Sequence, residues 1–173
     1  MPDDLFAVAI SGSPGAPSKS RTLAERALLE LASLGCQTQL IDVAGLPADA
    51  LVGRAESSAI AEAIAAVGRA RIVVAASPTY RALYTGVLKC FFDLMPQEHL
   101  AGKVCVGLQT GIAPQHALSA EYGFRPLFAS LEGVPLSVTY VLDSDFTDGE
   151  PSPEVVARVS AAMQGAVNVA RAG

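Results

Sequence analysis

The chain has 173 residues, a length typical of one domain; 51% of them are hydrophobic and only 17% are charged. This composition excludes intrinsic disorder, because so many apolar side chains can bury enough surface to offset the entropy lost on folding. Twelve basic and seventeen acidic residues leave a net charge of −5, and the lysines and arginines form no cluster. Nucleic-acid binding is therefore not expected.

The first residues and the cysteines indicate where the protein works. Residues 1–4 are acidic and lack the positive region and the cleavage site of a signal peptide. No apolar run approaches the roughly 20 residues that span a bilayer. Cys36, Cys90 and Cys105 are odd in number and have no C-x-x-C spacing, which argues against a disulfide framework or a zinc site. We expect a cytoplasmic protein with no metal and no contact with a membrane.

Apolar and amphipathic segments alternate along the chain. In order, the pattern predicts a strand at 5–11, a helix at 22–34, a strand at 38–43, a helix at 57–70, a strand at 72–76, a helix at 85–95, a strand at 104–108, a helix at 115–131, a strand at 136–142 and a helix at 153–170. Ser57 or Ser58 suits the N-cap of the second helix. The repeated strand–helix units predict a single α/β domain over residues 1–173, with helices on both faces of a parallel sheet.

The strand patterns predict the order of the sheet. The strands at 5–11, 72–76 and 104–108 are continuous apolar runs, whereas those at 38–43 and 136–142 alternate. Strands buried on both faces are continuously apolar, and edge strands alternate. The pattern favours the flavodoxin-like order 2-1-3-4-5, a five-stranded parallel sheet inside a three-layer α/β/α sandwich. In a dinucleotide-binding order the second strand would be interior.

Ligands of such sheets bind at the carboxyl ends of the strands, which makes the loops 12–21, 77–84 and 110–116 the candidate site. In the first loop, backbone amides and a following helix predict a phosphate cradle, with Lys19 or Arg21 as a further positive charge. The hydroxyl groups of this cradle belong to Ser13, Ser18, Ser20 and Thr22. The alternative is a polar turn that ends in a serine N-cap.

Motifs of other enzymes on this class of sheet are missing. The first loop resembles a Walker loop, but Ser18 precedes Lys19 where that motif needs glycine, so nucleotide hydrolysis is excluded. G-x-G-x-x-G, C-x5-R and G-x-S-x-G are also absent. The second loop is bulky and aromatic, which suits a flat ring, and Gly111 in the third allows backbone amides to approach a ligand. Together the three loops indicate a site for flavin mononucleotide (FMN).

Several motifs occur together in one order. They are G-S-P-x-x-x-S-x-S-x-x-L at 12–23, P-x-Y at 78–80, Y-x-G-x-L-K at 84–89 with Asp93 after it, L-x-G-K at 100–103, and T-G at 110–111 with His116. In these motifs the chain resembles the NAD(P)H-dependent FMN reductases, in particular the branch that supplies reduced flavin to sulfonate monooxygenases. Gly15 and Ile112 depart from the pattern, since many relatives have arginine and a second glycine there.

The resemblance implies a set of FMN-binding residues. The phosphate would be held by Ser13, Ser18, Ser20, Arg21 and Thr22. The isoalloxazine ring would be bordered by Pro78, Thr79, Tyr80 and Tyr84, and its pyrimidine edge by Thr110 and Gly111. His116 would lie beside that edge or at a subunit contact. The resemblance also implies a homodimer or homotetramer, with Tyr122 at the tetramer interface.

The implied reaction is hydride transfer from NAD(P)H to FMN, giving FMNH2 for a two-component flavin monooxygenase. Because the flavin accepts hydride directly, we expect no catalytic side chain, neither a covalent nucleophile nor an acid–base group. Two alternatives stay open: a quinone or azo-compound reductase that keeps FMN bound, and a flavodoxin-type electron carrier. The carrier ranks third because −5 is a mild charge for an acidic docking surface.

Other residues are interpreted as structural. The three cysteines are expected to be inert, and His99 is expected to lie in solvent. Phe91 and Phe92 are adjacent and cannot face the same way on a helix, so we expect one in the core and the other at a dimer interface. Asp143, Asp145 and Asp148 resemble a calcium loop only superficially and are expected to form a solvated turn.

Overall fold

The structure, a computed structural model, describes residues 5–173, so the acidic segment 1–4, which we expect not to be a signal peptide, lies outside the described residues. The strands are β1 (Phe6–Ser11), β2 (Gln37–Asp42), β3 (Ile72–Pro78), β4 (Val104–Gly111), β5 (Val134–Leu142), β6 (Phe146–Thr147) and β7 (Glu150–Pro151). The helices are α1 (Lys19–Ser33), α2 (Ala48–Leu51), α3 (Ser58–Arg69), α4 (Gly86–Asp93), α5 (His116–Ala129) and α6 (Pro153–Ala172), and short 3₁₀ turns are η1 (Val43–Gly45) and η2 (Asp143–Asp145).

The main sheet has five parallel strands in the order β2-β1-β3-β4-β5. This order confirms the flavodoxin-like prediction, with β2 and β5 at the edges. The burial of the strands explains why their apolar patterns predicted the strand order. β4 is buried along its whole length, whereas most of β2 is exposed or half-buried. An interior strand needs apolar side chains on both faces, and an edge strand does not.

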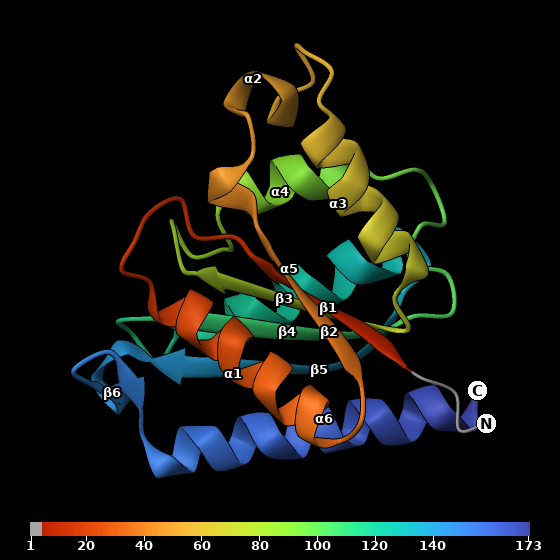
Figure 1. The fold of residues 1–173 in the computed structure, drawn as a ribbon. Helices are drawn as coiled ribbons and strands as arrows, with labels where there is room; N and C mark the ends of the chain where they lie inside the picture. The colour runs from red at the N-terminus through yellow and green to blue at the C-terminus, as the bar shows by residue number, and fades with distance from the viewer. Residues whose placement is uncertain (1–4) are drawn as a thin grey trace.

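Helices cover both faces of the sheet (Figure 1). The orange α1 and the blue α6 lie on one face, and α3, α4 and α5 lie on the other. Alternate side chains of each strand therefore enter two separate cores: Ala7 and Ala9 pack toward α1 and α6, whereas Val8 and Ile10 pack toward the other three helices. Within residues 5–173, no helix combines the length and apolar character needed to cross a membrane.

Serine and threonine side chains determine where four helices begin. Ser18, Ser57, Thr85 and Ser152 each accept a hydrogen bond from a backbone N–H in the first turn of α1, α3, α4 and α6. Ser57, rather than Ser58, is the cap of the second predicted helix. The cap at Ser18 starts α1 at Lys19 instead of at residue 22, so part of the predicted phosphate loop is the first turn of a helix.

Two structural interpretations were wrong. Phe91 and Phe92 are both buried, at 0% and 2% exposure. Their rings meet edge to face in the core between the sheet and the helices α3, α4 and α5. Neither is available for a dimer interface. His99 is half-buried rather than solvated, and its Nε2 lies 2.9 Å from the carbonyl oxygen of Ile64 in the middle of α3. The sequence also did not predict α2 or the β6–β7 hairpin, which are too short to show a period.

The cysteines lead to a testable prediction about thiol reactivity. Burial raises the pKa of Cys105 to about 12 and raises that of Cys36, whereas Cys90 is half-buried on α4. Because the thiolate is the reactive form, a maleimide at pH 8 should label Cys90 first and Cys105 only after unfolding. Peptide mapping by mass spectrometry, with and without guanidinium, measures this order. Rapid labelling of Cys105 in the folded protein would contradict it.

Candidate functional site

A cavity of about 810 Å³ opens at the carboxyl ends of β1, β3 and β4, where the three predicted loops meet. The segment from η2 to the β6–β7 hairpin closes one side. The cavity is lined by Ser13, Pro17, Ser18, Lys19, Thr22, Pro78, Thr79, Tyr80, Arg81, Ala82, Thr110, Gly111, Ile112, His116, Asp143 and Gly149. This is the position that the switch point of a flavodoxin-like sheet favours for a ligand.

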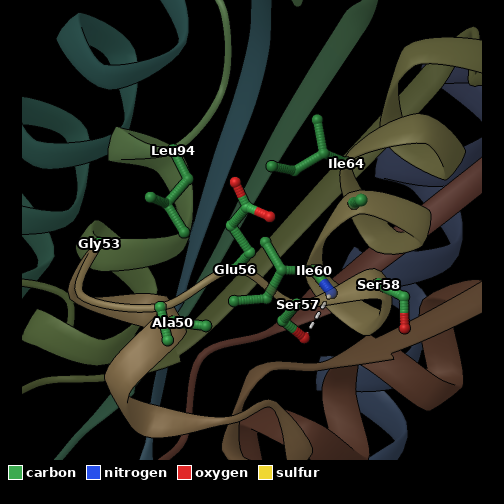
Figure 2. Close-up of a pocket in the computed structure, with 10 residues that line it drawn as sticks. Ala50, Gly53, Glu56, Ser57, Ser58, Ile60, Ile64 and Leu94 are labelled. Carbon is green, nitrogen blue, oxygen red and sulfur yellow. Dashed lines mark hydrogen bonds between the residues drawn. The ribbon is translucent and has the colours of Figure 1, made fainter.

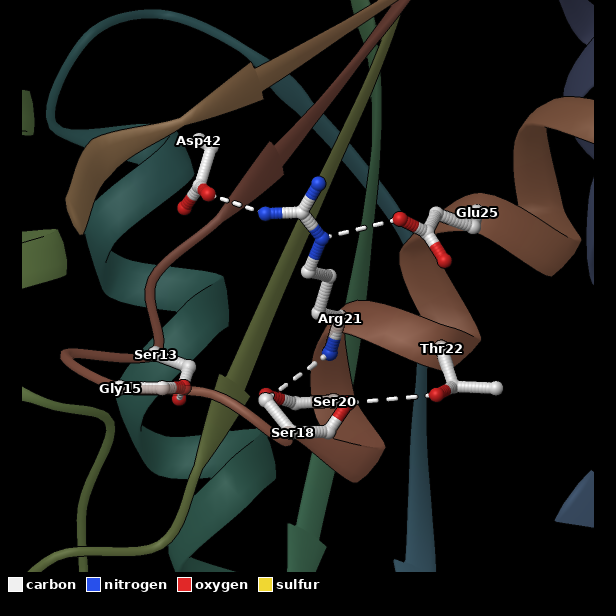
Figure 3. Close-up of polar contacts among 8 residues, drawn as sticks. All are labelled: Ser13, Gly15, Ser18, Ser20, Arg21, Thr22, Glu25 and Asp42. Carbon is white, nitrogen blue, oxygen red and sulfur yellow. Dashed lines mark hydrogen bonds and ion pairs between the residues drawn. The ribbon is translucent and has the colours of Figure 1, made fainter. Parts of the chain in front are cut away.

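The β1–α1 loop forms a cradle of hydroxyl groups at the positive end of α1 (Figure 3). The Oγ of Ser18 accepts a hydrogen bond from the Arg21 N–H at 3.2 Å, and Thr22 Oγ1 donates to the Ser18 carbonyl oxygen at 3.2 Å. Ser13 Oγ donates to the carbonyl oxygen of Gly15 at 2.9 Å. Hydroxyls held beside the N–H groups of a first helical turn suit a phosphate. Ser13, Ser18 and Thr22 all face the cavity.

The two cations of this loop are already paired. Arg21 does not line the cavity; its guanidinium points away toward Asp42 and Glu25, and the hydrogen bond to Glu25 is 2.9 Å long (Figure 3). These carboxylates, Glu25 first, raise the pKa of Arg21. Lys19 Nζ donates to the Asp143 carbonyl oxygen at 3.0 Å and lies 3.4 Å from the carboxylate of the same residue. The positive charge of Arg21 is therefore directed away from the cradle. The positive charge of Lys19 lies at the cavity, but the Asp143 carboxylate neutralises it.

Two further residues predicted for the site lie beneath it. Ser20 is 1% exposed and shares a hydrogen bond of 3.1 Å with Ser18 Oγ, so it supports the cradle from below. Tyr84 packs against Phe124 of α5, with ring centroids 5.4 Å apart, and burial raises its pKa. The next residue, Thr85, donates to the Gly12 carbonyl oxygen and draws the chain inward. Neither Ser20 nor Tyr84 lines the cavity.

The β4–α5 loop packs closely against Tyr140 and Thr79 because Gly111 has no side chain. A Cβ atom at Gly111 would collide with Tyr140 Oη and would lie 2.8 Å from Thr79 Oγ1. Tyr140 Oη donates a 2.8 Å hydrogen bond to the Ala113 carbonyl oxygen, which holds the far side of the loop. Burial raises the pKa of Tyr140 above its ordinary value, which already lies well above neutral pH, so the hydroxyl is a donor there.

A buried glutamine supports the same loop. Gln109 is 0% exposed, and its Nε2 donates to Thr79 Oγ1 at 2.8 Å. Thr79 Oγ1 in turn donates to the Thr110 carbonyl oxygen at 2.8 Å, and the Thr79 N–H donates to the same oxygen at 2.7 Å. Gln109 and Tyr140 were missed from the sequence. The one available signal was a glutamine directly after the apolar run VCVGL.

His116 begins α5 and lines the cavity. Its Nδ1 is buried and has no hydrogen-bond partner among residues 5–173. An unpaired buried nitrogen is costly unless a ligand or water completes it. The cradle at α1, the glycine at the loop and this nitrogen together fit the phosphate, the flat ring and the polar edge of FMN. The residues present therefore suit the cofactor that the sequence implies.

The third wall is a tight turn between β3 and α4. Tyr80 and Leu83 exchange two backbone hydrogen bonds, and the residues between them, Arg81 and Ala82, have φ values of +50° and +63°. Two consecutive left-handed residues are the backbone of a mirror-image hairpin turn, for which asparagine and glycine are preferred. Each left-handed residue with a Cβ costs about 1–2 kcal/mol. Tyr80, 55% exposed, extends from this turn at the cavity mouth.

Ala82→Gly should stabilise the protein, because glycine adopts a positive φ without strain. Glycine relieves the strain but also has the greater entropy in the unfolded chain, which offsets part of the effect. The net free energy of unfolding should rise by about 0.5–1 kcal/mol, and the Tm by about 1–4 °C. Calorimetric unfolding measures the change. Gly53 already has a φ of +73°, so Gly53→Ala is the matched opposite and should destabilise. A lower Tm for Ala82→Gly would contradict the assigned strain.

A second hollow of about 570 Å³ lies between α2, α3 and the end of α4 (Figure 2). Its walls are largely aliphatic, and the Glu56 side chain points in between Leu94 and Ile64. The Ser57 hydroxyl is occupied as the cap of α3. A carboxylate at this position would repel a phosphate, and the hollow lacks the strand ends and convergent amides of the first cavity. The first cavity is therefore the candidate flavin site.

Comparisons with known proteins support this assignment. The family model described as "NADPH-dependent FMN reductase" matches residues 7–148. An NADH-dependent FMN reductase, SfnF, of Pseudomonas fluorescens is 33% identical over 159 residues, which cover 89% of this chain and 85% of that protein. An FMN reductase (NADPH) of Escherichia coli is 31% identical over 149 residues, covering 85% and 78%.

The fold comparison agrees with the sequence comparison. The crystal structure of an NADH:FMN oxidoreductase, EMOB, superposes with a TM-score of 0.86 at 34% identity, covering 95% of this chain and 89% of that one. The cavity lies at the expected sheet edge, and the matched residues 7–148 include all three of its loops. The chain therefore belongs to the NADPH-dependent FMN reductase family and is an oxidoreductase that acts on FMN and NAD(P)H.

Proposed function

We propose that residues 1–173 form one cytoplasmic reductase domain that takes FMN as an exchangeable substrate and supplies FMNH2 to a two-component flavin monooxygenase. The observation that carries this proposal is the charge balance of the phosphate cradle. Lys19 is paired with Asp143, and Arg21 is directed to Glu25 and Asp42. The phosphate would therefore meet hydroxyls and backbone N–H groups without an unpaired cation from this loop.

A cradle of this kind favours release. Hydroxyl and N–H donors already make charge-assisted hydrogen bonds to a phosphate, and an unpaired cation would add the Coulomb attraction of two opposite charges. Without an unpaired guanidinium or ammonium group, FMN would be held less tightly and would exchange after reduction. The similarity to SfnF, whose name describes it as an NADH-dependent FMN reductase, is consistent with this role.

In this proposal the chain binds and orients, and the cofactor supplies the redox chemistry. FMN when bound accepts a hydride from NAD(P)H. Ser13, Ser18 and Thr22 hold the phosphate while Ser20 supports them. Pro78, Thr79 and Tyr80 border the ring, and Thr110 with Gly111 reaches its pyrimidine edge beside His116. The N–H groups of the β4–α5 loop and the positive end of α5 would stabilise negative charge at that edge. Arg21 and Tyr84 lie outside the cavity, where Arg21 pairs with Glu25 and Asp42 and Tyr84 packs on Phe124.

The test is NADPH oxidation by protein freed of flavin, measured while FMN is raised from less than one equivalent to a large excess. If FMN is a substrate, the rate saturates in excess FMN with no other acceptor present. Turnover that needs an added quinone or azo dye at one FMN per subunit would instead establish the reductase with bound FMN. Loss of NADPH oxidation under both conditions would contradict the reductase assignment.

We also propose a homodimer or homotetramer that uses the face around the cavity mouth. Tyr80 and Ile112 are exposed and line the cavity, Leu83 is exposed on the same turn as Tyr80, and Leu118 and Tyr122 are exposed on α5. Leu83 packs against α5 at Gly123. This contact places the turn next to the helix that carries Tyr122. Contiguous exposed apolar groups are typical of protein interfaces. Sedimentation velocity should show an oligomer that Tyr122→Arg dissociates and Leu29→Arg, on α1, leaves intact. A monomeric wild type would contradict the proposal.

A further inference from the structure

The turn that closes the cavity, residues 80–83, holds an arginine in a strained backbone. The Tyr80 N–H donates to the Leu83 carbonyl oxygen at 2.8 Å, and the Leu83 N–H donates back at 3.2 Å. Between them, Arg81 and Ala82 both adopt a positive φ. Strain of this kind persists where surrounding contacts impose it, and it is concentrated at functional sites.

Contacts on both sides make the turn rigid. Leu83 packs so closely on α5 that a Cβ at Gly123 would lie 2.7 Å from its Cδ1. On the other side, Ser77 Oγ accepts a 2.9 Å hydrogen bond from the Thr85 N–H, which fixes the start of α4. The backbone of Arg81 is therefore held in place, and its side chain lines the cavity.

Arg81 brings an unneutralised charge to the cavity. It is exposed and makes no ion pair or side-chain hydrogen bond within residues 5–173. The other cationic side chain that lines the cavity, Lys19, is paired with Asp143. An arginine fork without a carboxylate partner is suited to bidentate binding of phosphate oxygens.

Two substrates bring phosphate groups to this cavity, and they need separate binding sites. The phosphate of FMN fits the cradle at α1. The turn instead follows Thr79, whose N–H bonds to the Thr110 carbonyl oxygen at 2.7 Å, so it belongs to the ring end of the cavity. We propose that Arg81 binds the phosphates of the nicotinamide dinucleotide. This inference deepens the reductase function and rests on it.

The test compares Arg81→Gln with Arg54→Gln, an exposed arginine of the α2–α3 connection that does not line this cavity. FMN-loaded proteins are titrated by calorimetry with NADP⁺, NAD⁺ and ADP-ribose, none of which can reduce the flavin. The Kd of FMN is measured separately by the quenching of its fluorescence. Steady-state kinetics with NADPH give KM and kcat for each variant.

Arg81→Gln should raise the Kd of NADP⁺ about 10-fold and the KM for NADPH similarly, while kcat and the Kd of FMN stay within about twofold. Arg81→Lys should recover part of the loss, and Arg54→Gln should change nothing. Equal losses for NADP⁺, NAD⁺ and ADP-ribose identify the pyrophosphate as the bound group; a loss for NADP⁺ alone identifies the 2′-phosphate.

Three results would overturn the proposal: an unchanged dinucleotide Kd in Arg81→Gln, an equal loss in Arg54→Gln, or a loss confined to FMN. The last would assign Arg81 to the FMN phosphate. Failure of the function itself looks different, because the wild type would then bind no dinucleotide and oxidise no NADPH. That outcome would remove this inference together with the function on which it rests.

Discussion

Gly111→Ala is expected to reduce FMN affinity and NADPH:FMN turnover by about 100-fold. The new Cβ would occupy the space of Tyr140 Oη and Thr79 Oγ1, and both of these are tied to backbone oxygens by hydrogen bonds. The loop or these side chains must then shift at the cavity wall, and a displacement of about 1 Å at a site costs on this order. Fluorescence titration with FMN and steady-state kinetics measure the two effects.

Two further variants separate this effect from a general loss of stability. Gly45→Ala lies outside the cavity, has no atom within 4 Å of its added Cβ, and should behave like the wild type. The double variant Gly111→Ala/Tyr140→Phe removes one of the two colliding oxygens and should recover part of the FMN affinity. Circular dichroism should show a folded protein in each case, since overpacking costs about 1–3 kcal/mol. FMN binding by Gly111→Ala that matched the wild type would contradict the close approach.

Phe124→Ala should lower the free energy of unfolding by about 3–5 kcal/mol, the usual cost of removing a buried aromatic ring. Phe124 is 0% exposed, and its ring stacks on Phe128 with centroids 5.6 Å apart. It also fills the space above Gly107, where a Cβ would come within 2.8 Å of the ring. The loss therefore loosens α5 from β4, and α5 carries His116. Denaturant unfolding at constant pH gives the change.

The matched control for Phe124→Ala is Leu29→Ala on α1. Leu29 is 65% exposed, so its truncation should change the stability by less than about 0.5 kcal/mol. We expect Phe124→Ala also to weaken FMN binding at temperatures where the protein stays folded, because the β4–α5 loop ends at this helix. A loss below about 1 kcal/mol would mean that the ring is not part of a packed core.

The sheet and its ligand-binding edge could be predicted because they depend on local patterns. Continuous apolar runs distinguished β1, β3 and β4 from the alternating edge strands, and the strand order followed from that difference. Ser57 was one of two serines recognisable as the cap of α3 from their type and position, whereas the cap of α1 at Ser18 was not assigned. The loops were then placed by topology, since parallel strands bring their carboxyl ends to one edge.

The sequence alone determined the fold class, the strand order and the three loops that form the site, because burial on one or both faces imposes a period on neighbouring residues. Only the tertiary structure decided how the charged and polar groups pair. Lys19 pairs with a residue 124 positions away, and Arg21 with one 21 positions away. Such partners are selected by proximity in three dimensions, which leaves no period in the sequence. For the same reason, only the fold showed that Arg81 reaches the cavity without a partner while Tyr84 turns into the core.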